Sequence, residues 1–369
     1  MTETAESIVD ADLRYICGAL RAEFDRMAGA RLLIVGGAGF LGYYLVQSVL
    51  FWNNSSGTTN PIDITVFDNY SRGLPPWLSA LEGDENLHLV EHDITEPLPA
   101  SMPDFQFIVH AASIASPIFY RQHPIETMDA NVNGLRSLLE YAKQQRDSPR
   151  PVEGFLFFSS SEIYGDPTPD NIPTPETYRG NVSCTGPRAC YDESKRYGET
   201  LCVNFAEQYG LPIKVARPFN NYGPGLKITD HRVLPDFARD VLEGRDIVMK
   251  SDGGPRRTFC YVADAVCGYY KVLVNGAPGH AYNIGVETPE ISVGDLAAKV
   301  AALGKELFGY SGEVVTKFDA DYVADNPERR CPVIDKARAE IGFAPTILVD
   351  EGLRRALIWY SGNRVAEEL

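Results

Sequence analysis

The sequence lacks the features of several common protein classes. Its 369 residues include 34 Lys and Arg against 50 Asp and Glu, a formal net charge of -16, so a basic surface for nucleic acid or acidic membranes is missing. Residues 1–12 are acidic and contain no apolar run, unlike an export signal. The longest apolar stretch, residues 40–52, falls short of the roughly 20 residues that a membrane helix needs. We therefore expect a cytoplasmic protein with no membrane and no nucleic-acid partner.

Paired cysteines and metal-ligand clusters are also missing. The seven cysteines are scattered without a CxxC pair, and no His/Cys group has the spacing of a zinc site. Neither a disulfide framework nor a bound metal is predicted, as is typical of a reducing compartment. The 44% hydrophobic content excludes a disordered or fibrous chain and suffices for one large domain or two smaller ones.

Short β-rich runs alternate with helical patterns through the first 220 residues. This alternation is typical of an α/β fold in which a doubly wound parallel sheet is covered by helices on both faces. The expected strands are Arg31–Val35, Ile62–Phe67, Leu87–Glu91, Phe107–His110, Gly154–Ser159 and Ile213–Ala216. The expected helices are Ala11–Met27, Gly39–Phe51, Pro124–Gln145, Tyr191–Tyr209, Val293–Leu303 and Glu351–Ser361.

Changes in texture along the chain indicate three parts. Residues 1–29 form a helical extension to which we assign no function, and residues 30–216 form the main nucleotide-binding domain. After residue 217, loops rich in Gly and Pro replace the regular alternation. We expect residues 217–369 to form mainly a smaller α/β lobe for substrate, partly interleaved with the main domain.

A glycine-rich segment follows the first strand directly and opens a helix. Gly36, Gly39 and Gly42 are spaced GxxGxxG, with Phe40 and Leu41 between the last two. Glycines at this point let the backbone approach a pyrophosphate, whose charge then lies at the positive end of the helix. A tight turn is the plainer alternative. The segment predicts a Rossmann-type dinucleotide site.

Polar residues at the next two strand ends support that interpretation. Asp68 ends a strand, and a carboxylate there can accept hydrogen bonds from a ribose while repelling a 2′-phosphate, which favours NAD over NADP. Asn69 follows it. Asp93 and Ile94 end the neighbouring strand, where an adenine edge can be bound, although an acidic loop cap explains them equally well.

The second motif is a Tyr and a Lys four residues apart. Tyr191 and Lys195 share one face of the predicted helix 191–209. A phenol has an ordinary pKa of about 10, and a neighbouring ammonium should lower it, so that Tyr191 could act as a base. Such pairs also occur by chance on helix surfaces. With the glycine segment upstream and Ser160 at the end of a strand, a Ser-Tyr-Lys catalytic group becomes the better interpretation.

Together these motifs resemble a known family. The GxxGxxG segment, the run Ser159-Ser160-Ser161-Glu162-Ile163-Tyr164-Gly165 and the YxxxK motif are similar to the extended short-chain dehydrogenase/reductases that modify nucleotide sugars. The resemblance covers about residues 30–360. Within that family, residues 186–196 (GPRACYDESKR), 115–117, 217–224, 257–262 and Arg330 most resemble the UDP-glucuronate decarboxylases.

The resemblance implies roles for further residues. It adds Ala111, Ala112 and Ser113 to the NAD site and Tyr120 to the substrate site, and it implies a homodimer. Ser161-Glu162 stands where the related 4,6-dehydratases carry Asp-Glu, and the decarboxylases pair this Ser-Glu with an arginine at the position of Arg257. Glu162 and Arg257 are therefore expected to be catalytic, with an ion pair between the two as the plainer alternative. Met249 and Lys250 stand where those decarboxylases carry an aromatic residue that stacks on uracil.

An acidic protein needs local cations to hold an anionic substrate. Arg188, Arg232 and Arg330 are candidates for the diphosphate of a nucleotide sugar, and Arg257 for its carboxylate, although a salt bridge explains each arginine alone equally well. Asn220 is a candidate for a phosphate or sugar contact.

The leading hypothesis is an NAD-dependent decarboxylase that converts UDP-glucuronate to UDP-xylose or its 4-keto intermediate. The alternatives are a nucleotide-sugar 4,6-dehydratase or 4-epimerase, and a non-catalytic NAD-binding regulator. The presence of Ser160, Tyr191 and Lys195 together argues against the regulator.

Overall fold

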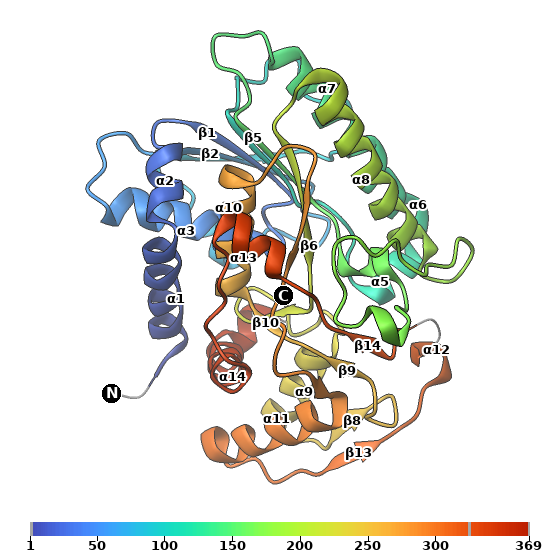
Figure 1. Cartoon of the computed structure of the whole chain (residues 1–369). Coiled ribbons are helices and arrows are strands. Elements are labelled where there is room, and N and C mark those ends of the chain that lie inside the picture. The colour runs from blue at the N-terminus through green and yellow to red at the C-terminus, as the bar shows by residue number, and fades with distance from the viewer. Residues whose placement is uncertain (1–2, 324–325, 368–369) are drawn as a thin grey trace.

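A seven-stranded parallel sheet forms the centre of the molecule (Figure 1). The computed structural model describes residues 3–323 and 326–367. The strand order is β11-β6-β5-β4-β1-β2-β3, which confirms the predicted doubly wound α/β architecture. The strands are β1 Arg31–Val35, β2 Asp63–Asp68, β3 Leu87–Glu91, β4 Phe107–His110, β5 Gly154–Phe158, β6 Ile213–Pro218 and β11 Ala281–Ile284.

Helices cover both faces of this sheet because successive side chains of a strand point to opposite faces. In β1, Leu32 and Ile34 belong to the core that includes α3 (Gly42–Ser55) and α10 (Val262–Asn275). Leu33 and Val35 belong to the opposite core, against α7 (Leu135–Gln145) and α8 (Ala189–Tyr209). The hydrophobic runs of the central strands are therefore buried on both sides.

The N-terminal extension is two helices rather than the single helix predicted over Ala11–Met27. α1 spans Ala5–Ala19 and begins at a capping box between Thr4 and Ser7, and α2 spans Arg21–Met27. The prediction missed the cap and therefore started six residues too late. The chain leaves helical geometry at Leu20, whose φ and ψ are -111° and 15°. α1 packs beside α3, α10 and α14 (Val349–Glu367).

Two other predicted helices differ from the structure in detail. The helix expected over Gly39–Phe51 begins only at Gly42, because residues 36–41 form the turn that follows β1. The helix expected over Pro124–Gln145 contains a π-helical turn, η1 (Ala130–Gly134), between α6 (Pro124–Asp129) and α7. Gly134 allows close packing there, since an added Cβ would meet Ile94 at 2.9 Å.

A smaller lobe lies below the sheet in Figure 1. It contains a three-stranded sheet of order β12-β9-β14 and the parallel pairs β10-β7 and β13-β8. The strands are β7 Asn221–Tyr222, β8 Ile247–Met249, β9 Arg256–Arg257, β10 Cys260–Tyr261, β12 Ile291–Ser292, β13 Val314–Thr316 and β14 Arg329–Arg330. The remaining helices are α4 Pro76–Ser79, α5 Pro117–Gln122, α9 Val233–Leu242, α11 Val293–Phe308, α12 Ala320–Val323 and α13 Asp335–Ile341, with short 3-10 turns η2 Ser161–Tyr164 and η3 Pro169–Asn171.

The lobe and the main sheet exchange chain segments. β11 and α10 follow residue 217 in sequence, yet β11 pairs with β6 at the edge of the main sheet and α10 covers its face. None of the helices within residues 3–323 and 326–367 is both long and apolar enough to span a bilayer.

Candidate active site

The glycine turn after β1 lies against the end of β4. Gly36 has a φ of +83°, and a Cβ there would meet the backbone N and Cα of Ala112 at 2.5 Å. Gly42 begins α3, and a Cβ there would lie 2.0 Å from the Gly37 carbonyl oxygen. A side chain at Gly36 would therefore push the turn away from the end of β4, and one at Gly42 would distort the turn itself, which contains Phe40 and Leu41.

The N-terminus of α3 faces this turn without a side-chain cap. Leu41 occupies the N-cap position and provides no side-chain hydrogen bond to the first helical N–H groups. These donors and the partial positive charge of the helix end are suited to a pyrophosphate. The residues present fit the expected dinucleotide.

The polar residues at the ends of β2 and β3 form one hydrogen-bonded group. The Asp68 carboxylate accepts the N–H groups of Ala38 and Tyr70, both at 3.0 Å, so it also fixes the glycine turn. Asn69 donates to Asp93 at 2.9 Å, which joins the two predicted strand ends, while Ile94 is buried just beyond. At the end of β4, Ala111 donates to Val35, and the buried Ser113 hydroxyl has no partner among the described residues.

Ser160, Tyr191 and Lys195 come together as predicted, at the end of β5 and the start of α8. The Ser160 hydroxyl is hydrogen-bonded to Tyr191 and accepts the N–H of Glu162 at 3.2 Å. Lys195 Nζ lies 5.6 Å from the centroid of the Tyr191 ring and donates to the Phe158 carbonyl at 2.8 Å. All three side chains are buried.

The expected lowering of the Tyr191 pKa is wrong for the structure as it stands. Burial raises the pKa of Tyr191 to about 12, and the hydrogen bond from Ser160 opposes that rise only in part. Burial also lowers the pKa of Lys195 to about 7, so this lysine is a weaker source of positive charge than a solvated one.

A second cluster of charges surrounds Glu162 in the turn η2. Its carboxylate forms an ion pair with Arg188 and another with Arg330, whose NH2 lies 2.6 Å from Oε2. Burial alone would raise the pKa of Glu162, but the two arginines outweigh it and lower the pKa to about 2. The carboxylate is therefore fixed as an anion. The alternative considered from the sequence, an ion pair between Glu162 and Arg257, is therefore wrong, because Glu162 pairs with Arg188 and Arg330 instead.

Arg257 and Arg330 lie side by side because β9 and β14 pair in parallel with those two residues in register. Arg257 donates to the main-chain carbonyls of Arg256 at 2.7 Å and Glu328 at 3.1 Å. No described carboxylate lies within ion-pair distance of it. Burial, and then the charge of Arg330, lower the pKa of Arg257 to about 9. A buried cation held only by carbonyl groups is suited to an anionic ligand.

The other predicted substrate residues border the same region. The Tyr120 ring stacks on Tyr191 with centroids 5.1 Å apart, and the Arg188 guanidinium lies 6.0 Å from the Tyr120 centroid. Arg232 pairs with Asp230 at 2.9 Å, and its charge opposes part of the rise in the pKa of Tyr191. Asn220 instead donates to the Thr258 carbonyl at 2.9 Å, so its amide nitrogen holds the loop beside Arg257.

The sequence interpretation assigned no role to Asp192, which adjoins this cluster. Its Oδ2 lies 3.8 Å from Arg188 Nε, one helical turn earlier on α8. Burial, and then the charge of Glu162, raise the pKa of Asp192 to about 7. The sequence feature that indicates this pair is an Arg and an Asp at spacing i, i+4, which overlaps the YxxxK motif.

Buried polar atoms without partners gather around these residues. Among the described side chains, they include Tyr120 OH, Asp192 Oδ1, Thr258 Oγ1 and Arg330 Nε. Buried polar groups are almost always hydrogen-bonded in proteins. Their concentration beside Tyr191 and Arg257 therefore marks a place where a polar ligand would complete the bonding.

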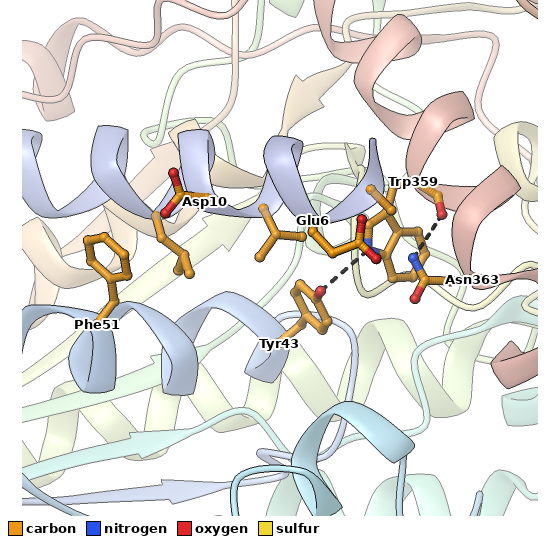
Figure 2. A pocket seen from close by; sticks show the side chains of 9 residues that line it. Glu6, Asp10, Tyr43, Phe51, Trp359 and Asn363 are labelled. Carbon is orange, nitrogen blue, oxygen red and sulfur yellow. Dashed lines mark hydrogen bonds between the residues drawn. The ribbon is translucent and has the colours of Figure 1, made fainter. Parts of the chain in front are cut away.

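A separate hollow lies among α1, α3 and α14 (Figure 2). It has a volume of about 270 Å³, and Figure 2 shows Trp359 directed toward Tyr43, to which its indole donates at 3.3 Å. Its lining residues are Ala5, Glu6, Val9, Asp10, Leu13, Tyr43, Phe51, Trp359 and Asn363. No predicted site residue is among them, so the hollow is not part of the candidate active site.

Comparisons with known proteins agree with this geometry. The model of the "NAD dependent epimerase/dehydratase family" matches residues 32–285. The chain is 38% identical over 323 residues to UDP-glucuronic acid decarboxylase 3 of Arabidopsis thaliana, covering 88% of this chain and 86% of that protein. It is 36% identical over 330 residues to UDP-glucuronic acid decarboxylase 1 of Xenopus tropicalis, covering 89% and 72%.

Solved structures with the same fold include two nucleotide-sugar enzymes. UDP-glucose 4-epimerase of Thermotoga maritima, with UDP-glucose, has a TM-score of 0.75 at 26% identity, covering 89% of this chain and 98% of that one. A dTDP-glucose 4,6-dehydratase of Streptomyces venezuelae, with NAD, has a TM-score of 0.77 at 24% identity, covering 91% and 98%. The dehydratase likeness shows the fold alone.

Proposed function

Because the chain belongs to the NAD dependent epimerase/dehydratase family, we propose that it is an NAD-dependent enzyme that decarboxylates UDP-glucuronic acid. The observation that supports this most is the position of the Ser160-Tyr191-Lys195 group next to a buried cluster of arginines around Glu162. The first group suits oxidation of a sugar hydroxyl, and the second suits a sugar that carries its own carboxylate. The curated relatives carry the name of this activity.

Tyr191 starts the reaction by removing the proton of the sugar 4-hydroxyl, with Ser160 hydrogen-bonded to the phenol. The glycine turn and the residues around Asp68 would hold NAD, which would supply the hydride acceptor for C4 and a positive charge that favours the phenolate. Lys195 lies over the Tyr191 ring, and we propose that it binds the ribose of the nicotinamide half of NAD.

The oxidised sugar is a β-keto acid, because the new ketone at C4 lies next to the carbon that bears the carboxylate. Carbon dioxide can leave since the electron pair delocalises into the ketone as an enolate. Ser160 and Tyr191 are placed to hydrogen-bond the oxygen on which this charge develops. Protonation of C5 restores the ketone. Return of the hydride to C4 then gives the pentose, and release before that return gives the 4-keto sugar.

We propose that different arginines bind the carboxylate and the diphosphate of the substrate. Arg257 and Arg330 are in register on adjacent strands, so their two positive charges lie side by side where we propose that the carboxylate binds. Arg188 and Arg232, with Tyr120 and Asn220, lie at the border of this region and are proposed for the diphosphate and sugar.

The single carboxylate at the end of β5 favours decarboxylation over 4,6-dehydration. Ser161, immediately before Glu162, is a buried hydroxyl rather than a second acid. Elimination of water across C5 and C6 needs both an acid and a base. Loss of carbon dioxide from a β-keto acid needs instead a ketone that accepts the electron pair and a donor to the oxygen on which the charge develops.

The deciding experiment supplies the purified protein with NAD and UDP-glucuronate and measures carbon dioxide and the sugar product. We expect carbon dioxide together with UDP-xylose or its 4-keto form. UDP-glucose serves as the matched substrate without a carboxylate. A changed sugar without carbon dioxide would support a dehydratase or epimerase, and no turnover of any nucleotide sugar would support a non-catalytic regulator.

We also propose a homodimer formed through α6 and α8, which Figure 1 shows on one flank of the molecule. Three large apolar side chains are exposed there, Ile125 at 63%, Met128 at 43% and Tyr197 at 51%. Their burial against a second copy would remove this apolar surface from water. An Ile125→Glu variant should be monomeric by light scattering if this flank is the interface.

We propose a cytoplasmic location, supported by the cysteines. All seven cysteines are free, which fits a reducing compartment.

A further inference from the structure

Decarboxylation consumes one proton per turnover, because a carboxylate leaves as neutral carbon dioxide and a hydrogen takes its place on C5. Tyr191 is not the net source of this proton, since the proton that it removes from the 4-hydroxyl returns when C4 is reduced. A buried site therefore needs a second group that carries a proton at neutral pH. This requirement rests on the function proposed above.

Glu162 is poorly suited to the task. Its carboxylate is fixed by Arg188 and by Arg330, with 2.6 Å between its Oε2 and Arg330 NH2, so both arginines oppose its protonation. Substrate that carries a further carboxylate into this cluster increases the local negative charge and favours proton uptake at whichever acid is least well neutralised.

Asp192 is that acid. Only 5% of the residue is exposed, its Oδ1 has no partner among the described residues, and its other oxygen lies 3.8 Å from the nearest arginine nitrogen. Burial therefore disfavours the ionised form of Asp192, because no close cation or donor replaces the lost hydration. The charged and titratable groups around it are Glu162 from η2, Arg330 from β14, Tyr120 from α5, and Arg188, Cys190, Tyr191 and Glu193 from its own helix.

We propose that Asp192 stores the proton that each turnover consumes, taking it up as the anionic substrate binds beside Glu162 and releasing it to C5 after carbon dioxide leaves. The bond between C5 and the carboxylate breaks, and its electron pair forms the enolate. C5 then takes the proton from the Asp192 carboxyl and the ketone is restored. Solvent returns a proton to the Asp192 carboxylate. The pKa of Asp192, raised to about 7 by burial and then by Glu162, agrees with this role.

The binding test measures proton uptake by calorimetry in buffers of different ionisation enthalpy. It uses the NAD-loaded Tyr191→Phe protein at pH 8, where a group with a pKa of about 7 is about nine-tenths ionised. UDP-glucuronate should cause uptake of a large fraction of one proton, UDP-glucose should cause less, and the additional change Asp192→Asn should abolish the difference. An unchanged difference would assign the uptake elsewhere, with Lys195 the next candidate, and would overturn the proposal.

The kinetic test follows a single turnover of Asp192→Asn, with Asp192→Glu as the variant that keeps an acid and Glu193→Gln as the neighbouring control. We expect oxidation and carbon dioxide release to continue in Asp192→Asn, while pentose formation falls about 100-fold and reduced nicotinamide accumulates. In the wild type, kcat/KM for pentose formation should decline as pH rises through about 7, because kcat/KM reports ionisation of the free enzyme, and this limb should disappear in Asp192→Asn.

The outcomes separate this proposal from the proposed function. If the wild type releases no carbon dioxide, the function itself is wrong. If the wild type releases it and Asp192→Asn either behaves like the wild type or slows all steps equally, Asp192 is not the proton store. Rescue by Asp192→Glu supports the role.

Discussion

Asp12 joins the N-terminal helix to three other parts of the chain through a fully buried carboxylate. It accepts hydrogen bonds from the hydroxyl groups of Tyr44 on α3 at 2.7 Å and Tyr261 on β10 at 2.6 Å. Arg355 on α14 donates a third hydrogen bond to it at 2.6 Å. Burial raises the pKa of Asp12, and these donors oppose the rise. We predict that Asp12→Ala strongly destabilises the fold.

The magnitude follows from the groups left behind. Each tyrosine hydroxyl that loses its acceptor in a buried position costs about 1–3 kcal/mol. Arg355 keeps a second partner, Glu351, at 2.7 Å, and so adds less than a fully buried cation would. We expect Asp12→Ala to reduce the free energy of unfolding by about 3–5 kcal/mol. Asp12→Asn should cost less because it keeps one acceptor oxygen.

Urea unfolding followed by tryptophan fluorescence measures this loss. The matched control is Asp10→Ala on the same helix, where the carboxylate is half exposed and pairs with Arg14 one turn away, and it should cost less than about 0.5 kcal/mol. Equal losses for the two variants would refute the argument that α1 is held by its buried carboxylate.

Three further predictions concern the candidate site. Tyr191→Phe should abolish turnover while NAD still binds by calorimetry, and Tyr197→Phe on the exposed face of the same helix should retain full activity; activity in the first variant would exclude Tyr191 as the base. Gly36→Ala should weaken NAD binding at least tenfold in the same calorimetric assay, because its Cβ would meet the Ala112 backbone at 2.5 Å. Arg330→Ala should lower kcat for decarboxylation about 100-fold in a carbon dioxide assay, since it removes a cation proposed to orient the carboxylate, and an unchanged kcat would assign that carboxylate to another residue.

Local patterns were sufficient to predict the sheet and the proximity of Ser160, Tyr191 and Lys195. β1, β3 and β4 have the predicted bounds, because buried parallel strands are short apolar runs with sharp ends. The proximity of Ser160, Tyr191 and Lys195 could be predicted because a strand end and one helix turn determine their geometry. By contrast, Glu162 and Arg330 are 168 residues apart, and only the register of β9 and β14 brings Arg330 to the end of β5.

The pKa values of groups in the folded site could also not be predicted from the sequence. A lysine four residues from Tyr191 predicted a lower pKa for the phenol, but desolvation acts on both side chains and reverses the direction. The same effect gives Asp192 a proton affinity that no spacing rule predicts.

β11 ties the two lobes together through the order of the chain. The chain leaves the main sheet after β6, builds part of the smaller lobe, and returns with α10 and β11, the second of which extends the sheet beside the strand that it left. No single cut would therefore yield two intact lobes. Truncation after β6 would remove both an edge strand and a covering helix from the main sheet.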